Sequence, residues 1–129
     1  MKGCLIDTNV ALLATIKPEA LTQRVRRAIE ARPVFLSTIS FWEVVLKSMK
    51  RNLDVGDPRN WWKIALEDLA ATPMLLAPDH IAEIYNLPPL HTDPFDRALI
   101  AQATVAGLDL ATTDAQIARY SSDRLCIVS

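Results

Sequence analysis

Five acidic residues stand where a strand is expected to end or a helix to begin: Asp7, Glu43, Asp93, Asp96 and Asp114. In an open parallel sheet, ligands bind at the edge formed by the carboxyl ends of the strands. Carboxylates gathered at such an edge repel one another, and a bound cation is the usual compensation. Mg²⁺ and Mn²⁺ prefer oxygen ligands of this kind. The positions of the acids therefore suggest one metal site assembled from distant parts of the chain.

Most of these acids also have a purely structural explanation. Asp7, Asp93 and Asp114 are suitable N-caps for the helix that follows each of them. Pro94, directly after Asp93, fits the first helical position, and Asp96 would then lie in the first turn, where a negative charge suits the helix dipole. For any one acid alone, the capping role is a sufficient explanation.

Glu43 has two such alternatives. Ser40-Phe41-Trp42-Glu43 fits a capping box, in which Glu43 would accept from the N–H of Ser40. Glu43 could also pair with Lys47 one turn later. His91 is a possible further contributor to a metal site, although a lone histidine beside two prolines is more often an ordinary loop residue.

The elements that must position these residues alternate along the chain. Short apolar segments without clean alternation predict buried strands; they are Gly3–Asp7, Val34–Ser37, Met74–Ala77, Leu108–Ala111 and Leu125–Val128. Helical patterns predict helices at Val10–Ile16, Glu19–Ala31, Ser40–Lys50, Arg59–Ala71, Pro78–Tyr85, Asp93–Ala106 and Asp114–Tyr120. The expected fold is an α/β/α sandwich of three layers around a parallel sheet of about five strands.

The length, net charge and composition of the chain limit the kinds of protein that it can be. The chain of 129 residues has a net charge of −1 and is 50% hydrophobic, which predicts a single domain over residues 1–129 without general attraction to nucleic acid. Cys4 and Cys126 are expected to be buried thiols in a reducing cytoplasm. We expect no secretory leader and no membrane span, because the longest apolar stretch is short and bounded by charges.

Four stretches together resemble one family: LIDTNV, STISFWEV, HTDPFDRALIAQA and LATTDAQIARY. They look like the motifs of PIN-domain nucleases, and more closely of VapC-type toxins from bacterial and archaeal toxin–antitoxin pairs. They occur in the family's order and span nearly the whole chain. LIDTN alone would be weak evidence, whereas its combination with HTDPFDRALIAQA is specific.

The resemblance implies a Mg²⁺- or Mn²⁺-dependent endoribonuclease acting in the cytoplasm. It also implies a homodimer and a VapB-like antitoxin whose tail blocks the acidic pocket. The family's catalytic and metal-binding quartet corresponds to Asp7, Glu43, Asp96 and Asp114. Asp93 ranks second because its capping role fits it better, and Thr8, Asn9 and Thr113 match polar positions beside the metal.

Within this expectation the four acids have different roles. Asp7 would be the primary ligand and Asp96 its nearest co-ligand. Asp114 would hold a second ion or an outer water, and Glu43 would orient the attacking water or complete the site.

Binding of RNA would require local positive charge. Lys47, Lys50, Arg51 and Arg97 could contact flanking phosphates, although the first three equally fit a solvated basic face. The arginines between Arg24 and Arg32 fit a solvent face or an antitoxin contact. Trp61 and Trp62 could stack on bases or line an interface, but helical spacing suggests that at least one packs internally.

Two other functions fit parts of the pattern. A Mg²⁺-dependent phosphohydrolase would use Asp7 as its nucleophile, but enzymes of that kind place a second aspartate where Asn9 stands. A non-catalytic module that binds RNA or protein would leave the acids as caps, without a bound metal.

Overall fold

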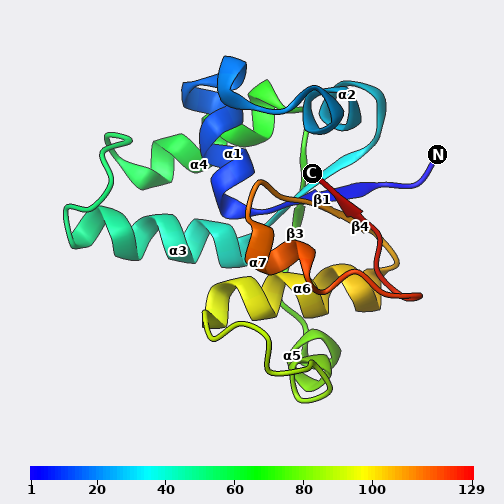
Figure 1. The fold of residues 1–129 in the computed structure, drawn as a ribbon. Helices are drawn as coiled ribbons and strands as arrows, with labels where there is room; N and C mark the ends of the chain where they lie inside the picture. Colours follow the sequence, from blue (N-terminus) through cyan, green and yellow to red (C-terminus); the bar gives the residue numbers. More distant parts are fainter.

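The computed structural model describes all residues 1–129 and has a five-stranded, all-parallel sheet at its centre (Figure 1). The strands are β1 (Cys4–Ile6), β2 (Val34–Ser37), β3 (Thr72–Met74), β4 (Asp109–Ala111) and β5 (Ile127–Val128). Their order across the sheet is β3-β2-β1-β4-β5. The strands β2 and β3 are therefore added on one side of β1, and β4 and β5 are added on its other side, so the strand order reverses between β1 and β4. A reversal of this kind opens a crevice at the carboxyl ends of the two strands.

Helices cover both faces of the sheet. They are α1 (Thr8–Ile16), α2 (Gln23–Ala31), α3 (Thr38–Met49), α4 (Pro58–Asp68), α5 (Pro78–Ile84), α6 (Pro94–Ala106) and α7 (Ala115–Ala118), with a short 3₁₀ helix η1 at Pro18–Ala20. In Figure 1, α1, α2 and α4 lie above the sheet, and α5, α6 and α7 lie below it. This arrangement confirms the predicted three-layer α/β/α sandwich. No helix is long and apolar enough to cross a membrane.

The central strand shows why apolar runs without alternation predicted this fold. Cys4 and Ile6 pack into the core shared with α1, α2 and α4, whereas Leu5 packs into the core shared with α6 and α7. All three side chains are fully buried. Burial of each large aliphatic side chain stabilises the fold by roughly 1.5–3 kcal/mol. A strand covered on both faces therefore needs apolar residues at every position.

The third strand was predicted too late in the chain. It occupies Thr72–Met74 rather than Met74–Ala77, and it pairs in parallel with β2 at one edge of the sheet. Pro73 lies in its middle, which an edge strand tolerates because the missing N–H faces away from the ladder. Leu75 is exposed and leads toward α5, so its hydrophobicity was misleading.

Several helices begin or end at other residues than those predicted. The predicted helix Glu19–Ala31 divides into η1 and α2 because Thr22 caps α2, its Oγ1 accepting from Val25 N at 3.2 Å. The last helix spans only Ala115–Ala118, shorter than the predicted Asp114–Tyr120. The fourth helix ends at Asp68, and Ala70 adopts a φ of 48°, which ends the helical path before Ala71.

One of the two cysteine predictions is wrong. Cys4 is buried in β1, and burial raises the pKa of its thiol to about 11. Cys126 is exposed, because it precedes the short edge strand β5 instead of lying inside it.

Candidate active site

A pocket of about 500 Å³ opens at the carboxyl edge of the sheet. It is lined by Asp7, Thr8, Asn9, Leu12, Glu43, Lys47, Asp93, Asp96, Thr113, Asp114, Ala115 and Ile117. The residues come from the end of β1 and the first turns of α1, the middle of α3, the start of α6, the loop after β4 and α7. All five acids of the sequence analysis therefore meet in one pocket, together with the three neighbouring polar residues that the resemblance identified.

Asp7 lies at the floor of this pocket, between β1 and α1. Its Oδ1 accepts from Val10 N at 2.8 Å, so Asp7 is the N-cap of α1. The residue is only 2% exposed. The pKa of its carboxyl is raised to about 6, mainly by burial; hydrogen bonds from Thr112 and Val10 lower it, and the charges of Asp96 and Asp114 add to the rise. A buried carboxylate in this position is costly without a cation.

Glu43 lies in the second turn of α3, because that helix begins at Thr38 with Ser37 as its N-cap. The predicted capping box from Ser40 is therefore absent. The predicted pair with Lys47 is present, with Nζ at 2.9 Å from Oε2. The second oxygen, Oε1, is buried and has no hydrogen-bond partner. It is thus an acceptor that the protein alone leaves unsatisfied.

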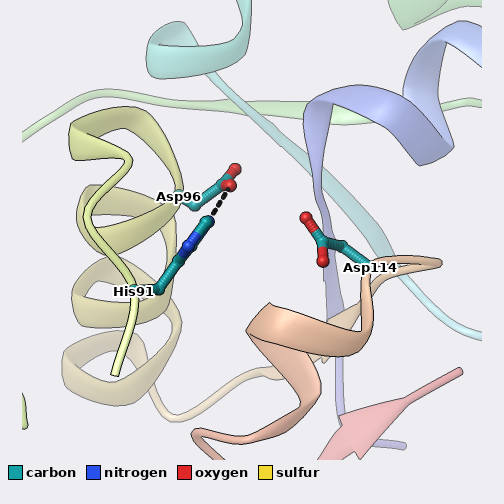
Figure 2. A group of neighbouring side chains, drawn as sticks. All are labelled: His91, Asp96 and Asp114. Atoms are coloured by element: carbon teal, nitrogen blue, oxygen red, sulfur yellow. Dashed lines mark hydrogen bonds and ion pairs between the residues drawn. The ribbon is translucent and has the colours of Figure 1, made fainter. Parts of the chain in front are cut away.

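Asp96 and Asp114 face each other across the pocket (Figure 2). His91 joins them: its Nε2 lies 2.8 Å from Asp96 Oδ2, and one ligand atom from each of the three residues lies within 4.8 Å of the others. Burial raises the pKa of Asp96, the charges of Asp93 and Glu43 add to the rise, and the hydrogen bond from His91 opposes it.

The capping explanation is correct for Asp7, Asp93 and Asp114, but it does not exclude a metal site. Asp93 Oδ1 accepts from the N–H groups of Phe95 and Asp96 at 2.9 and 3.0 Å, which makes it the N-cap of α6. Asp114 Oδ1 accepts from Gln116 N at 2.8 Å. A cap engages one carboxylate oxygen, so the same side chain can present its other oxygen to the pocket.

Polar neighbours fix the walls of the pocket. Thr8 Oγ1 donates to Ser40 Oγ at 3.0 Å, which ties the start of α1 to α3. Asn9 Nδ2 donates to Thr113 Oγ1 at 2.8 Å, which ties α1 to the loop after β4. These bonds hold segments from three parts of the chain in fixed register around the acids.

The four basic residues predicted to contact RNA divide into two groups. Lys47 lines the pocket, and Lys50 and Arg51 are exposed at the end of α3. Arg97 differs from the other three: its guanidinium donates to the carbonyl oxygens of Pro88 and His91 at 3.0 and 3.3 Å, which engages it within the fold.

Of the two adjacent tryptophans, at least one packs internally, as the helical spacing predicted. Trp61 is buried, and its Nε1 donates to Thr15 Oγ1 at 3.1 Å. Trp62 stacks on Phe41, with ring centroids 4.9 Å apart. Trp42, which the sequence analysis did not single out, is the exposed tryptophan, at 55%.

His91 is the site residue that sequence reasoning underrated. The only signal was its position five residues before Asp96 in HTDPFD. That spacing does not place two residues on one helical face, because the helix begins only at Pro94. The loop conformation that brings His91 to Asp96 is set by contacts with distant residues.

The donor set suits a hard divalent cation. Carboxylates predominate, and the unpartnered Oε1 of Glu43 is an oxygen donor that lacks only a ligand. Mg²⁺ and Mn²⁺ bind such oxygens, and Mn²⁺ also accepts an imidazole nitrogen. The residues present therefore fit a metal of this class.

Comparisons with known proteins agree with this geometry. A chain of VapBC2 from Rickettsia felis, solved bound to a promoter DNA fragment, superposes with a TM-score of 0.71 at 14% identity, covering 97% of this chain and 96% of that one. DNA-bound VapBC from Salmonella typhimurium gives 0.70 at 14% identity, with 98% of both chains covered. VapBC-5 from Mycobacterium tuberculosis gives 0.65 at 16% identity, covering 99% and 98%.

These structures share the fold of the chain, while a search of curated proteins finds no match. The family assignment comes from the sequence itself, since residues 4–122 match the PIN domain. PIN domains are generally nucleases. With its acidic pocket at the carboxyl edge of a parallel sheet, the chain belongs to the PIN-domain family.

Proposed function

We propose that this protein is a Mg²⁺- or Mn²⁺-dependent endoribonuclease and the toxin of a toxin–antitoxin pair. The observation that carries the proposal is the pocket, in which Asp7, Glu43, Asp96 and Asp114 converge from four segments of the chain. The match of residues 4–122 to the PIN domain supports nuclease activity. The fold shared with VapBC complexes supports the toxin role.

In this proposal the four acids hold the metal. When bound, the ion would lower the pKa of a water molecule and neutralise charge on the scissile phosphate. Glu43, with one oxygen unpartnered, is placed to accept a proton from an attacking water or to complete the ligand set. Asp7 fixes the site to the rigid end of β1, and its capping bond to Val10 prevents it from turning away.

Lys47, which pairs with Glu43, would also bind the phosphate of the substrate. It is the one basic residue in the pocket lining, and its Nζ pairs with Glu43 Oε2 at 2.9 Å. A phosphate entering the pocket would compete for this ammonium group, and its charge would then offset the repulsion between substrate and carboxylates. Lys50 and Arg51, exposed further along the chain, would contact flanking phosphates.

The proposed partners follow from the proposed toxin role. A VapB-like antitoxin would bind the protein, as the VapBC neighbours suggest, and would block the pocket. A homodimer is proposed from the sequence resemblance to VapC-type toxins, and light scattering of the purified protein would test it. The site of action would be the cytoplasm, where cellular RNA is available.

Digestion of total cellular RNA tests the activity. The purified, antitoxin-free protein would be incubated with Mn²⁺ or Mg²⁺, with EDTA, and in parallel as Asp7→Asn, and the new RNA ends would be sequenced. Asp123→Asn, a change at an exposed aspartate outside the pocket, is the matched control. Discrete ends that require metal and Asp7 would support the proposal and identify the substrate.

Other outcomes favour other functions. Phosphate released from small phosphomonoesters, with no RNA cleavage, would favour a phosphohydrolase. RNA binding without metal binding or cleavage would favour a non-catalytic module and leave the acids as caps.

A further inference from the structure

A hydrogen bond from outside the acidic quartet holds one of its members. His91 lies in the loop between α5 and α6, and its Nε2 donates to Asp96 Oδ2 at 2.8 Å. The side chains of both residues are largely buried, at 19% and 17% exposure. A hydrogen bond in such a setting restricts the carboxylate to one orientation, with Asp114 nearby (Figure 2).

The loop that carries His91 has no regular secondary structure, yet it is tied down at several points. Arg97 Nη1 donates to the carbonyl oxygens of Pro88 and His91, and to Tyr120 Oη at 3.1 Å. Tyr120 Oη in turn donates to Pro88 O at 2.9 Å. We call Arg97 and Tyr120 the loop clamp. Arg119 adds a third tie, donating to Leu90 O at 3.1 Å.

One member of the loop clamp, Arg97, lies in the same helical turn as Asp96. Asp96 and Arg97 are consecutive in the first turn of α6. Arg97 reaches out to hold the carbonyl of His91, and the imidazole of His91 reaches back to Asp96. Asp96, Arg97 and His91 thus form a closed hydrogen-bonded loop, which we call the circuit. Tyr120 connects this circuit to the segment after α7.

We propose that His91 is a positioning residue that presents Asp96 to the metal, and that the loop clamp holds His91 in place. The inference rests on the proposed metal-dependent function and adds a residue to it. Ligating carboxylates are commonly oriented by outer hydrogen bonds, and loss of such a partner weakens metal affinity by roughly 10–100-fold. The circuit also gives Arg97 a role in place of the RNA contact predicted from sequence.

Direct coordination by His91 is the alternative. It would require Nε2 to give up its contact with Asp96 Oδ2, in which the nitrogen is the donor because an ionised carboxylate can only accept. The structure has Nε2 already engaged, and this favours the positioning role.

Calorimetric titration with Mn²⁺ separates these possibilities. We expect His91→Ala to weaken binding by roughly 10–100-fold. His91→Gln should retain most of the affinity, since the glutamine amide can still donate to Asp96. In the Asp96→Asn background, His91→Ala should have no further effect. Circular dichroism would establish that each variant is folded.

The clamp is tested with Tyr120→Phe, which removes only the hydroxyl that binds Arg97 and Pro88. Its Mn²⁺ affinity should fall several-fold, and should fall no further when His91→Ala is already present. Tyr85→Ala, an exposed residue just after α5, is the matched control and should bind as the wild type does.

Three results would overturn the inference while leaving the proposed function intact. These are unchanged affinity in His91→Ala, equal loss in His91→Gln and His91→Ala, and a nitrogen hyperfine coupling to bound Mn²⁺ that His91→Ala removes. The third would show direct coordination. Failure of the wild-type protein to bind any Mn²⁺ would overturn both the inference and the proposed metal site.

Discussion

The charge of Asp7 should destabilise the metal-free protein, and its removal should stabilise it. Burial raises the pKa of this carboxyl from 3.8 to about 6. Two pKa units correspond to roughly 3 kcal/mol, since each unit is worth about 1.4 kcal/mol. Asp7→Asn keeps an oxygen that can accept from Val10 N and loses the charge. We expect a gain of about 1–3 kcal/mol in the free energy of unfolding at neutral pH in EDTA.

The pH dependence follows from the same shift. Between about pH 4 and pH 6 the folded state of the wild type binds more protons than the unfolded state does at Asp7. The free energy of unfolding of the wild type therefore falls as the pH rises through this window, because Asp7 loses its proton less readily in the folded state. Asp7→Asn should lack this fall, so the two proteins should converge in stability below about pH 4.

Urea denaturation followed by tryptophan fluorescence would measure both effects. Asp109→Asn is the matched control, because Asp109 is also a buried aspartate but pairs with Arg32 and with Lys2 at 3.0 Å. It should destabilise the protein. Added Mn²⁺ should stabilise the wild type and have little effect on Asp7→Asn. If Asp7→Asn proves less stable than the wild type in EDTA at neutral pH, the electrostatic reasoning is wrong.

Three further predictions concern single side chains. Glu43→Gln should lower RNA cleavage by about 100-fold or more in a steady-state assay, with exposed Glu67→Gln as its control; near-normal cleavage by Glu43→Gln would exclude the proposed role. Trp61→Phe should cost about 1–3 kcal/mol in urea denaturation, because it removes buried volume and the bond to Thr15, whereas exposed Trp42→Phe should cost little. Ellman's reagent should react with one thiol, Cys126, in the native protein and with Cys4 only after unfolding; two fast thiols in the native state would contradict the burial of Cys4.

The sequence was sufficient to predict the convergence of the acids. Asp7 follows a strand whose every residue is apolar, and such a strand belongs to the middle of a covered parallel sheet. Asp93 and Asp114 carry the usual chemistry of helix caps, which places each at the start of a helix. Where parallel strands and helix starts share one edge of a sheet, residues far apart in sequence meet.

The contacts of His91 and Arg97 could not be predicted in the same way. Both depend on how the loop before α6 folds. The carbonyl groups of that loop accept from Arg97 and Tyr120, and no local sequence pattern links Tyr120 to the loop. Arginine beside an acidic motif suggests a ligand contact as readily as an internal one. Only the folded chain shows which carbonyl oxygens the guanidinium meets.

The errors in β3 and at Cys126 have a related cause. Hydrophobicity predicts burial, but at the edges of a sheet the neighbouring elements decide it. Pro73 lies within the edge strand β3, and apolar Leu75 beyond it is exposed. Cys126 lies just outside the two-residue strand β5 and faces solvent.

The most direct test of the central claim is an anomalous difference map from crystals of the antitoxin-free protein soaked in Mn²⁺. We predict a peak in the pocket, within coordination distance of Asp7 and Asp96 and near Asp114 and Glu43. The peak should be absent from Asp7→Asn crystals soaked in the same way. A wild-type pocket without a peak, with manganese bound elsewhere or not at all, would contradict the assignment of these four acids to a metal.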